Sequence, residues 1–317
     1  MPFTVRRIDG LWVVVTSRLP ELQPADVIVT VDDKAVDDWL EAVREYIGQS
    51  SLSAVDRVIW AHSLLFPRQF VLGIEGGQRV SVDLEAEPSA AERGFLLAKA
   101  VEANHRPDGV VVIRIPSFES PEYEQAAITA IHAAKDASVI LLDLRGNGGG
   151  SAPDTLLSAI MTGPYRGSMF TTPMTIAMAD ASGSFDGAPQ ALPTVMMRYG
   201  PQQTNPSSDA WAGKMAILVD GGCASACEDF VLSFKDGNRG LVIGEPTFGS
   251  TGQPYMTTFP EFGMSFRVST KREYFPDGRP FEGVGIRPDL LVPLTIGQLK
   301  SGVDMQLATA AAAALSQ

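Results

Sequence analysis

The sequence predicts an α/β protein that carries a small β-rich module on its N-terminal side. Past residue 107, apolar runs of strand length alternate with amphipathic segments, which is typical of buried parallel strands covered by helices. Before residue 84, short strand-like runs follow one another with one helical segment among them. The chain has 317 residues, and at roughly 100–200 residues per domain this length suits two domains.

The N-terminal module is predicted to comprise residues 1–87. Its strand-like runs, rich in valine and isoleucine, are 11–15, 26–31 and 69–74. Over 36–47, apolar residues recur every three or four positions and carboxylates stand near the start, so a helix is predicted there. The segment 84–93 loses this periodicity and is interpreted as a linker.

The second domain is predicted to comprise residues 88–317. Its continuous apolar runs are expected to be buried strands, at 110–115, 138–144, 215–220 and 239–244. Its helical segments are expected at 123–134, 224–235 and 308–315. The stretch 163–211 has no clear period, and we interpret it as a long loop over a cleft.

Charge and cysteine content exclude several classes of protein. The net charge is -12 and the pI is near 4.7, so the positive surface that nucleic acid or anionic lipid requires is missing. No apolar run reaches about 18 residues and no signal-peptide pattern is present, so we expect a cytoplasmic protein with no membrane partner. Cys223 and Cys227 are interpreted as small apolar fillers in a reducing compartment.

Three segments that follow predicted strands carry the candidate chemistry, namely 143–150, 220–229 and 244–253. Ligands of α/β sheets gather at such strand ends. The three glycines at 148–150 leave backbone N–H groups open to an oxyanion, although a tight turn would explain them equally well. A phosphate loop is excluded because no Lys-Ser or Lys-Thr pair follows the glycines.

Ser225 is the candidate nucleophile. It stands after a predicted strand and a Gly-Gly turn, at the start of a predicted helix, where its side chain is exposed and the helix dipole stabilises an anion. The competing interpretation is an ordinary helix N-cap, which is a common role for a serine at this position. The motifs around Ser225 favour the nucleophile.

Four motifs, in this order, resemble the C-terminal processing, or tail-specific, serine protease family. They are Asp-Leu-Arg-Gly-Asn-Gly-Gly-Gly from 143, Ala-Ser-Ala-Cys-Glu from 224, Gly-Glu-Pro-Thr-Phe-Gly from 244 and Gly-Val-Gly-Ile-Arg-Pro-Asp from 283. The resemblance covers about 110–293 and implies a crotonase-like core of ββα units. It also implies that the N-terminal module is PDZ-like.

The resemblance implies how Ser225 would be activated. The backbone N–H of Ala226 would form an oxyanion hole together with Gly149 or Gly150. In the Ser-Lys branch of the family, the base lysine stands where this chain has Ser250. A hydroxyl cannot serve as a base by itself, so the Ser-Lys dyad is absent.

The chain looks closer to the branch related to the tricorn protease core, in which a glutamate orients a histidine base. Glu282 matches that glutamate. Ser250 and Thr251 then contact substrate beside the cleft.

The histidine base itself is not identified by any motif. In the tricorn-like branch it lies in an Asp-Gly-His segment upstream of the PDZ-like module, and this sequence contains no such segment. The candidates are His62, on a helical piece of the small module, His105, in a loop entering the core, and His132, on a predicted helix. We rank His62 first because the small module can fold over the cleft.

The sequence therefore predicts a serine peptidase-like hydrolase that acts on peptide or protein C-termini and needs no cofactor or metal. The alternative is an impaired or repurposed family member, either a peptide-binding protein or an enzyme that uses the oxyanion hole for other chemistry. The sequence leaves open whether the chain forms a homo-oligomer.

Overall fold

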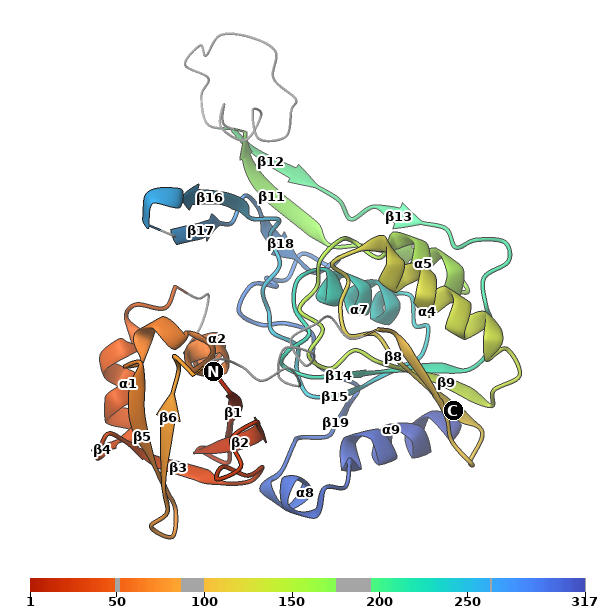
Figure 1. Ribbon diagram of the computed structural model, residues 1–317. Helices are drawn as coiled ribbons and strands as arrows, with labels where there is room; N and C mark the ends of the chain where they lie inside the picture. Colours follow the sequence, from red (N-terminus) through yellow and green to blue (C-terminus); the bar gives the residue numbers. More distant parts are fainter. Residues whose placement is uncertain (49–51, 87–99, 175–194, 263, 317) are drawn as a thin grey trace. The chain divides into compact units, whose positions relative to one another are not determined.

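The computed structural model describes residues 1–48, 52–86, 100–174, 195–262 and 264–316, which form two compact units (Figure 1). Unit 1 comprises Met1–Lys99 and Val292–Thr309, and unit 2 comprises Ala100–Leu291 and Ala310–Gln317. The sequence-based division placed all of 88–317 in the second domain. The structure instead assigns 292–309 to unit 1, because Leu294, Ile296 and Leu299 pack against a small cluster of buried side chains there.

Unit 1 is built on one antiparallel sheet. Its strands are β1 (Phe3–Ile8), β2 (Leu11–Ser17), β3 (Val27–Val31), β5 (Gln69–Ile74) and β6 (Arg79–Asp83), in the order β1-β2-β3-β5-β6, with β4 (Lys34–Ala35) paired to β3. The predicted strands match β2, β3 and β5, whereas β1 and β6 were not predicted. Both unpredicted strands alternate buried and more exposed side chains, so they lack the continuous apolar run on which the prediction relied.

Helices and short turns complete unit 1. They are α1 (Val36–Arg44), α2 (Leu52–Val58), η1 (Ile59–Ala61), η2 (Ser63–Leu65) and α8 (Ile296–Ser301). Leu40 of α1 is fully buried and joins the core of the sheet, which includes Trp12 and Trp60. The α8 helix begins with a capping box in which Thr295 and Gln298 satisfy each other's backbone N–H groups.

Unit 2 contains a six-stranded sheet in the order β19-β15-β14-β9-β8-β7. The strands are β7 (Glu102–His105), β8 (Val110–Arg114), β9 (Val139–Asp143), β14 (Met215–Val219), β15 (Leu241–Gly244) and β19 (Leu290–Leu291). All pairs are parallel except β7 with β8. Every residue of β9 and β14 is buried, as expected for central strands covered on both faces.

Three helices lie on one face of this sheet: α4 (Pro121–Ala133), α5 (Asp154–Ile160) and α7 (Ala226–Asp236) (Figure 1). The last helix, α9 (Met305–Leu315), runs from unit 1 into unit 2. Across the described parts of the chain, no helix is both long and apolar enough to span a bilayer. The longest described helix, α4, has 13 residues, whereas a span needs about 20.

The prediction of a long loop over 163–211 is wrong at both of its ends. There β10 (Tyr165–Arg166) pairs with β13 (Gln203–Thr204), and β11 (Met169–Met174) pairs with β12 (Val195–Tyr199) and β18 (Arg272–Tyr274). The run that forms β11 includes a proline, which hides a strand from pattern analysis. Residues 175–194 of the predicted loop, and most of the predicted linker at 84–93, lie outside the described residues.

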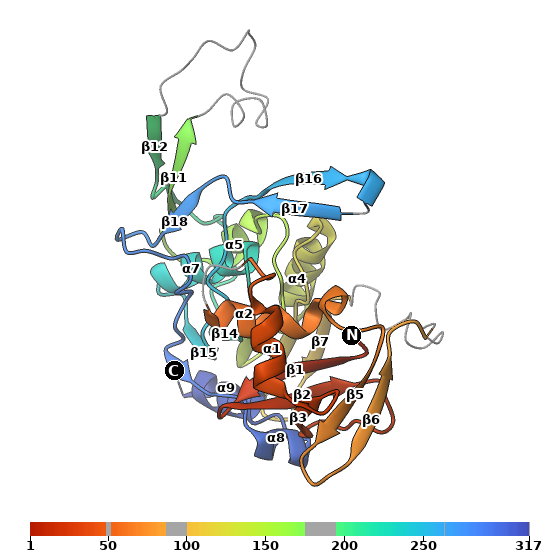
Figure 2. The same ribbon diagram turned by 90° about the vertical axis from the view of Figure 1, so that its left-hand side faces the viewer.

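A separate two-stranded hairpin extends from unit 2 (Figure 2). It consists of β16 (Tyr255–Phe259), the turn η3 (Pro260–Phe262) and β17 (Met264–Val268). Phe259 and Phe266 stack on each other across the hairpin, with ring centroids 5.6 Å apart.

Candidate active site

The three motif segments meet at one edge of the sheet of unit 2. They follow β9, β14 and β15, which are parallel, so their carboxyl ends lie at the same edge. The Ala224 N–H donates to the carbonyl of Asn147 (3.1 Å), and the Ser225 N–H donates to the carbonyl of Ser250 (2.9 Å). Backbone hydrogen bonds thus join the turn that carries Ser225 to the other two segments.

Ser225 has the conformation of a residue on a sharp strand-to-helix turn. Its φ is 54° and its ψ is -127°, immediately before the first residue of α7. A non-glycine residue in this sparsely populated region of positive φ costs on the order of 1–3 kcal/mol. The side chain makes no capping hydrogen bond to the helix, so the interpretation of Ser225 as an ordinary N-cap is wrong.

Gly149 lies directly against this turn. Its φ is 91°, and a Cβ at this position would lie 2.8 Å from both the Ala226 nitrogen and the Ser225 Cβ. Only glycine fits so close to these atoms. The Gly149 N–H already donates to Oδ1 of Asn147 (2.9 Å), which leaves Gly150 as the candidate partner of the Ala226 N–H. Whether these two donors bind an oxyanion stays a prediction.

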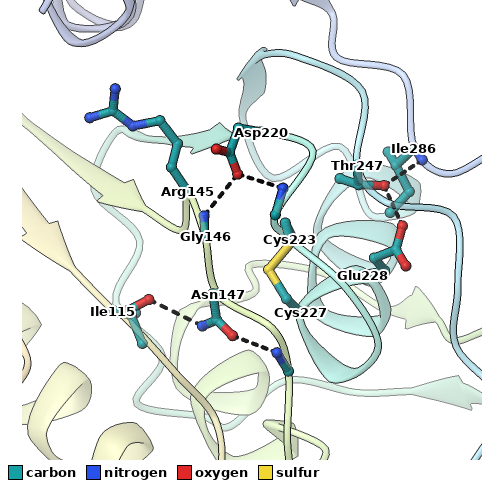
Figure 3. The surroundings of a disulfide bond; sticks show 12 residues. Ile115, Arg145, Gly146, Asn147, Asp220, Cys223, Cys227, Glu228, Thr247 and Ile286 are labelled. Carbon is teal, nitrogen blue, oxygen red and sulfur yellow. Dashed lines mark hydrogen bonds between the residues drawn. A yellow bond between two sulfur atoms is a disulfide. The ribbon is translucent and has the colours of Figure 1, made fainter. Parts of the chain in front are cut away.

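Two polar side chains, those of Asp220 and the buried Asn147, fix the glycine loop (Figure 3). Oδ1 of Asp220 accepts the N–H groups of Gly146 (2.8 Å) and Gly222 (2.9 Å). The Asn147 side chain is fully buried and donates to the carbonyl of Ile115 (3.1 Å). The loop after β9 and the turn after β14 are therefore held by the same carboxylate, which keeps them at a fixed separation.

Cys223 and Cys227 form a disulfide (Figure 3). Each lies two positions from Ser225 in the sequence. Both side chains are fully buried, as the filler interpretation expected. The interpretation is wrong about their bonding. One cysteine precedes α7 and the other lies in its first turn, so the Cα atoms are 5.4 Å apart, within the usual range of a disulfide.

Glu282 is half-buried and does not pair with a histidine among the described contacts. Its Oε1 accepts the backbone N–H of Glu273 (3.3 Å). Burial is the main cause that raises the pKa of Glu282 to about 7; the backbone donor lowers it, and the nearby carboxylates of Glu273 and Glu228 raise it further. The orienting role of Glu282 stays a prediction.

Sequence reasoning missed a buried acidic cluster that surrounds Glu282. Burial, together with the carboxylate of Glu273, raises the pKa of Asp229 to about 8. Lys271 lies against Glu273 and forms an ion pair with it. Asp229 stands in the first turn of α7, where the helix dipole already explains a carboxylate, and the sequence around Lys271 and Glu273 gives no sign of burial. Asp229 is more than forty residues from Lys271 and Glu273 in the sequence, so only the tertiary fold brings these side chains together.

Two of the three histidines lie at the wrong end of the sheet. His105 was expected in a loop, but it ends β7 and pairs with Val111, near the start of β8. His132 is exposed near the end of α4, shortly before β9 begins. Ser225 follows the opposite ends of these parallel strands, and a strand of five residues spans about 16 Å. His62 is exposed beside η1 in unit 1.

Ser250 and Thr251 lie in the loop after β15. The Ser250 carbonyl accepts the N–H of Ser225, as described above, and Thr251 is buried. Their contact with substrate stays a prediction. Among the described residues, no group of three or more His, Cys, Asp or Glu side chains has an arrangement that could hold a metal ion.

A serine on a strained strand-to-helix turn at the carboxyl edge of a parallel sheet defines the chain as an α/β protein with the site architecture of serine hydrolases. The chain belongs to peptidase family S41, whose family model matches residues 109–292.

The chain is similar to several known proteins. It is 25% identical over 276 residues to a "Probable CtpA-like serine protease" of Staphylococcus haemolyticus, covering 84% of this chain and 46% of that protein. It is 32% identical over 91 residues to a carboxy-terminal-processing protease of Bartonella bacilliformis, covering 29% and 21%. The chain thus spans less than half the length of these relatives.

The structure of mature CPAF complexed with lactacystin has a similar fold. The TM-score is 0.70 at 16% identity, and the match covers 95% of this chain and 80% of that chain.

Proposed function

We propose that the chain is a serine peptidase that acts on peptide or protein C-termini, with Ser225 as its nucleophile. The observation that carries this proposal is the backbone of Ser225, which is left-handed at the start of α7 with a side chain not used for capping. Strain of this kind persists where the surrounding structure enforces it, commonly at functional sites. Membership of family S41 supports the same reaction.

The reaction we propose is acyl transfer through Ser225. Its Oγ attacks the scissile carbonyl carbon while its proton passes to a base, and negative charge develops on the carbonyl oxygen. The N–H groups of Ala226 and Gly150 receive that oxygen. The C–N bond then breaks, the amine leaves with the proton, and water hydrolyses the resulting ester. Ser250 and Thr251 contact the substrate beside Ser225.

The base is proposed to be an imidazole oriented by Glu282. Because His105 and His132 lie at the far end of the sheet, three sources remain: His62 of unit 1, a histidine beyond this sequence, or one from a second copy. Loss of labelling in the His62→Ala variant would assign the base to His62, of the same chain or of a second copy. Unchanged labelling would leave a histidine beyond this sequence, or His105 or His132 of a second copy.

We also propose a more specific fold class for each unit and a cellular location. The core of unit 2 is proposed to be crotonase-like, and unit 1, with its antiparallel sheet, is proposed to be a PDZ-like module that binds substrate. A cytoplasmic location is also proposed. Disulfides are rare in reducing compartments, so the bond between Cys223 and Cys227 weighs against this location. Free thiols in protein isolated from cells would support the location, and an intact disulfide would contradict it.

Covalent labelling by a fluorophosphonate tests the proposal directly. The wild-type chain should be labelled at Ser225, and the Ser225→Ala variant should not. The Ser208→Ala variant is the matched control, because Ser208 is an exposed serine of unit 2. Peptides with free and amidated C-termini then test C-terminal preference. A wild-type chain that is neither labelled nor hydrolytic would favour the peptide-binding or repurposed alternative.

A further inference from the structure

Glu228 is a fully buried carboxylate on the first turn of α7, three residues after Ser225. Its Oε1 accepts the hydroxyl of Thr247 (2.5 Å) and the N–H of Gly249 (2.7 Å), and its Oε2 accepts the N–H of Ser250 (2.9 Å). All three donors belong to the loop after β15. A buried carboxylate needs such donors to offset the loss of hydration.

The same loop holds the main chain of Ser225. The Ser250 carbonyl accepts the Ser225 N–H, so the amide of Ser250 binds Glu228 while its carbonyl binds the nucleophile turn. The Ser225 carbonyl in turn accepts the N–H of Glu228 (2.7 Å). A closed ring of hydrogen bonds therefore runs from Ser225 through Glu228 and Ser250 and back to Ser225.

Glu228 also reaches the segment that contains Glu282. The Thr247 hydroxyl donates to Glu228 and accepts the N–H of Ile286 (2.8 Å). The Gly249 carbonyl accepts the N–H of Gly283 (2.7 Å). Displacing the loop after β15 would therefore disturb Ser225 and the neighbour of Glu282 together.

We propose that Glu228 is a positioning residue for the nucleophile: its carboxylate fixes the loop at 247–250, and that loop holds Ser225 in its left-handed conformation. This inference rests on the proposed function, because it assigns Glu228 to the reaction of Ser225. Glu228 contacts no reacting atom. It acts through Thr247 and the backbone of Ser250. Helix-dipole stabilisation, the usual reason for a carboxylate in this turn, does not require burial or these three donors.

The Glu228→Gln variant tests the proposal, because one of its side-chain atoms becomes an NH₂ group that cannot accept a backbone N–H. Fluorophosphonate labelling should keep its half-saturating concentration, whereas the maximal labelling rate should fall by roughly 100-fold, the cost of a misplacement of about 1 Å. The backbone amide of Ser225 should exchange hydrogen faster than in the wild type, while amides of β9 and β14 stay protected.

Thr247 and Val231 supply the matched variants. Thr247→Val removes one donor to Glu228 and should slow labelling, whereas Thr247→Ser keeps the hydroxyl and should restore it. Val231→Ala opens a cavity under α7, where Val231 is fully buried, and removes no hydrogen bond to the loop after β15, because valine has no polar side-chain atom. It should lower the unfolding temperature and leave the labelling rate unchanged.

Each result of the labelling and hydrogen-exchange measurements either supports or overturns the proposal. Wild-type labelling and wild-type exchange at Ser225 in Glu228→Gln would overturn it, as would an equal loss of labelling in Val231→Ala. Should Glu228→Gln fail to fold, the difference between Thr247→Val and Thr247→Ser decides. If the wild-type chain is not labelled at all, the proposed function fails, and the exchange rate at Ser225 alone shows whether Glu228 positions the turn.

Discussion

Replacing Gly149 with alanine is expected to displace the turn that carries Ser225. The new Cβ would lie 2.6 Å from the Ala224 carbonyl oxygen and 2.8 Å from both the Ala226 nitrogen and the Ser225 Cβ. Carbon atoms pack favourably at about 3.5–4.0 Å, so the two segments must separate by roughly 1 Å. A displacement of that size costs about 100-fold in rate when reacting groups must align.

Gly148→Ala is the control for this variant. A Cβ at Gly148 meets nothing within 4 Å, and its φ is not in the left-handed range, unlike the φ of 91° at Gly149. Gly149→Ala should therefore lose an additional 1–2 kcal/mol or so of unfolding free energy to backbone strain. The assay is the rate of fluorophosphonate labelling at 25 °C, with urea unfolding in parallel. Equal labelling of the two variants would refute the placement of Gly149 against the nucleophile.

Three further predictions concern the disulfide, Glu282 and Ser250. Cys223→Ala/Cys227→Ala should lower the unfolding free energy by about 2 kcal/mol in urea, because the bond closes a loop of only a few residues; unchanged stability in the double variant would contradict this. The pKa of Glu282 is raised from 4.5 to about 7, so its contribution to stability is complete below pH 4.5 and is lost as pH rises through 7. In the Glu282→Gln variant, the unfolding temperature should vary less between pH 4.5 and 7 than in the wild type. An equal variation in both proteins would contradict the raised pKa of Glu282. Ser250→Lys should not speed labelling between pH 7 and 9, since a lysine base also needs a lowered pKa; a large gain would refute this.

Buried strands were the part of the fold that sequence could predict well. Both faces of a parallel sheet are covered, so its strands are continuous apolar runs, as in β8, β9, β14 and β15. Such a strand can be recognised from its own sequence without knowing which strand it pairs with. β11 was missed for the opposite reason. It lies in a small three-stranded antiparallel sheet whose residues have no single buried face, and its pairing with β12 joins segments about twenty residues apart.

The disulfide and the membership of α8 in unit 1 depend on distances that a sequence does not contain. Cys223 stands on the turn before α7 and Cys227 inside its first turn, which brings their Cα atoms to 5.4 Å, within the range of a disulfide. The segment 292–309 follows β19 directly, yet it packs on unit 1 because Leu294, Ile296 and Leu299 find apolar partners there. In both cases the local pattern was compatible with more than one arrangement.

Glu228 shows why local explanations fail at the site itself. A carboxylate in the first turn of a helix is already explained by the dipole, so nothing in the sequence calls for a second role. Burial changes the argument, because a carboxylate with 0% exposure is tolerated only if donors surround it. The donors here come from a loop 19 to 22 residues away in the sequence, and that loop also holds Ser225. The fold therefore uses the buried carboxyl group of Glu228 to join two strand ends, and the strained turn of Ser225 lies where they meet.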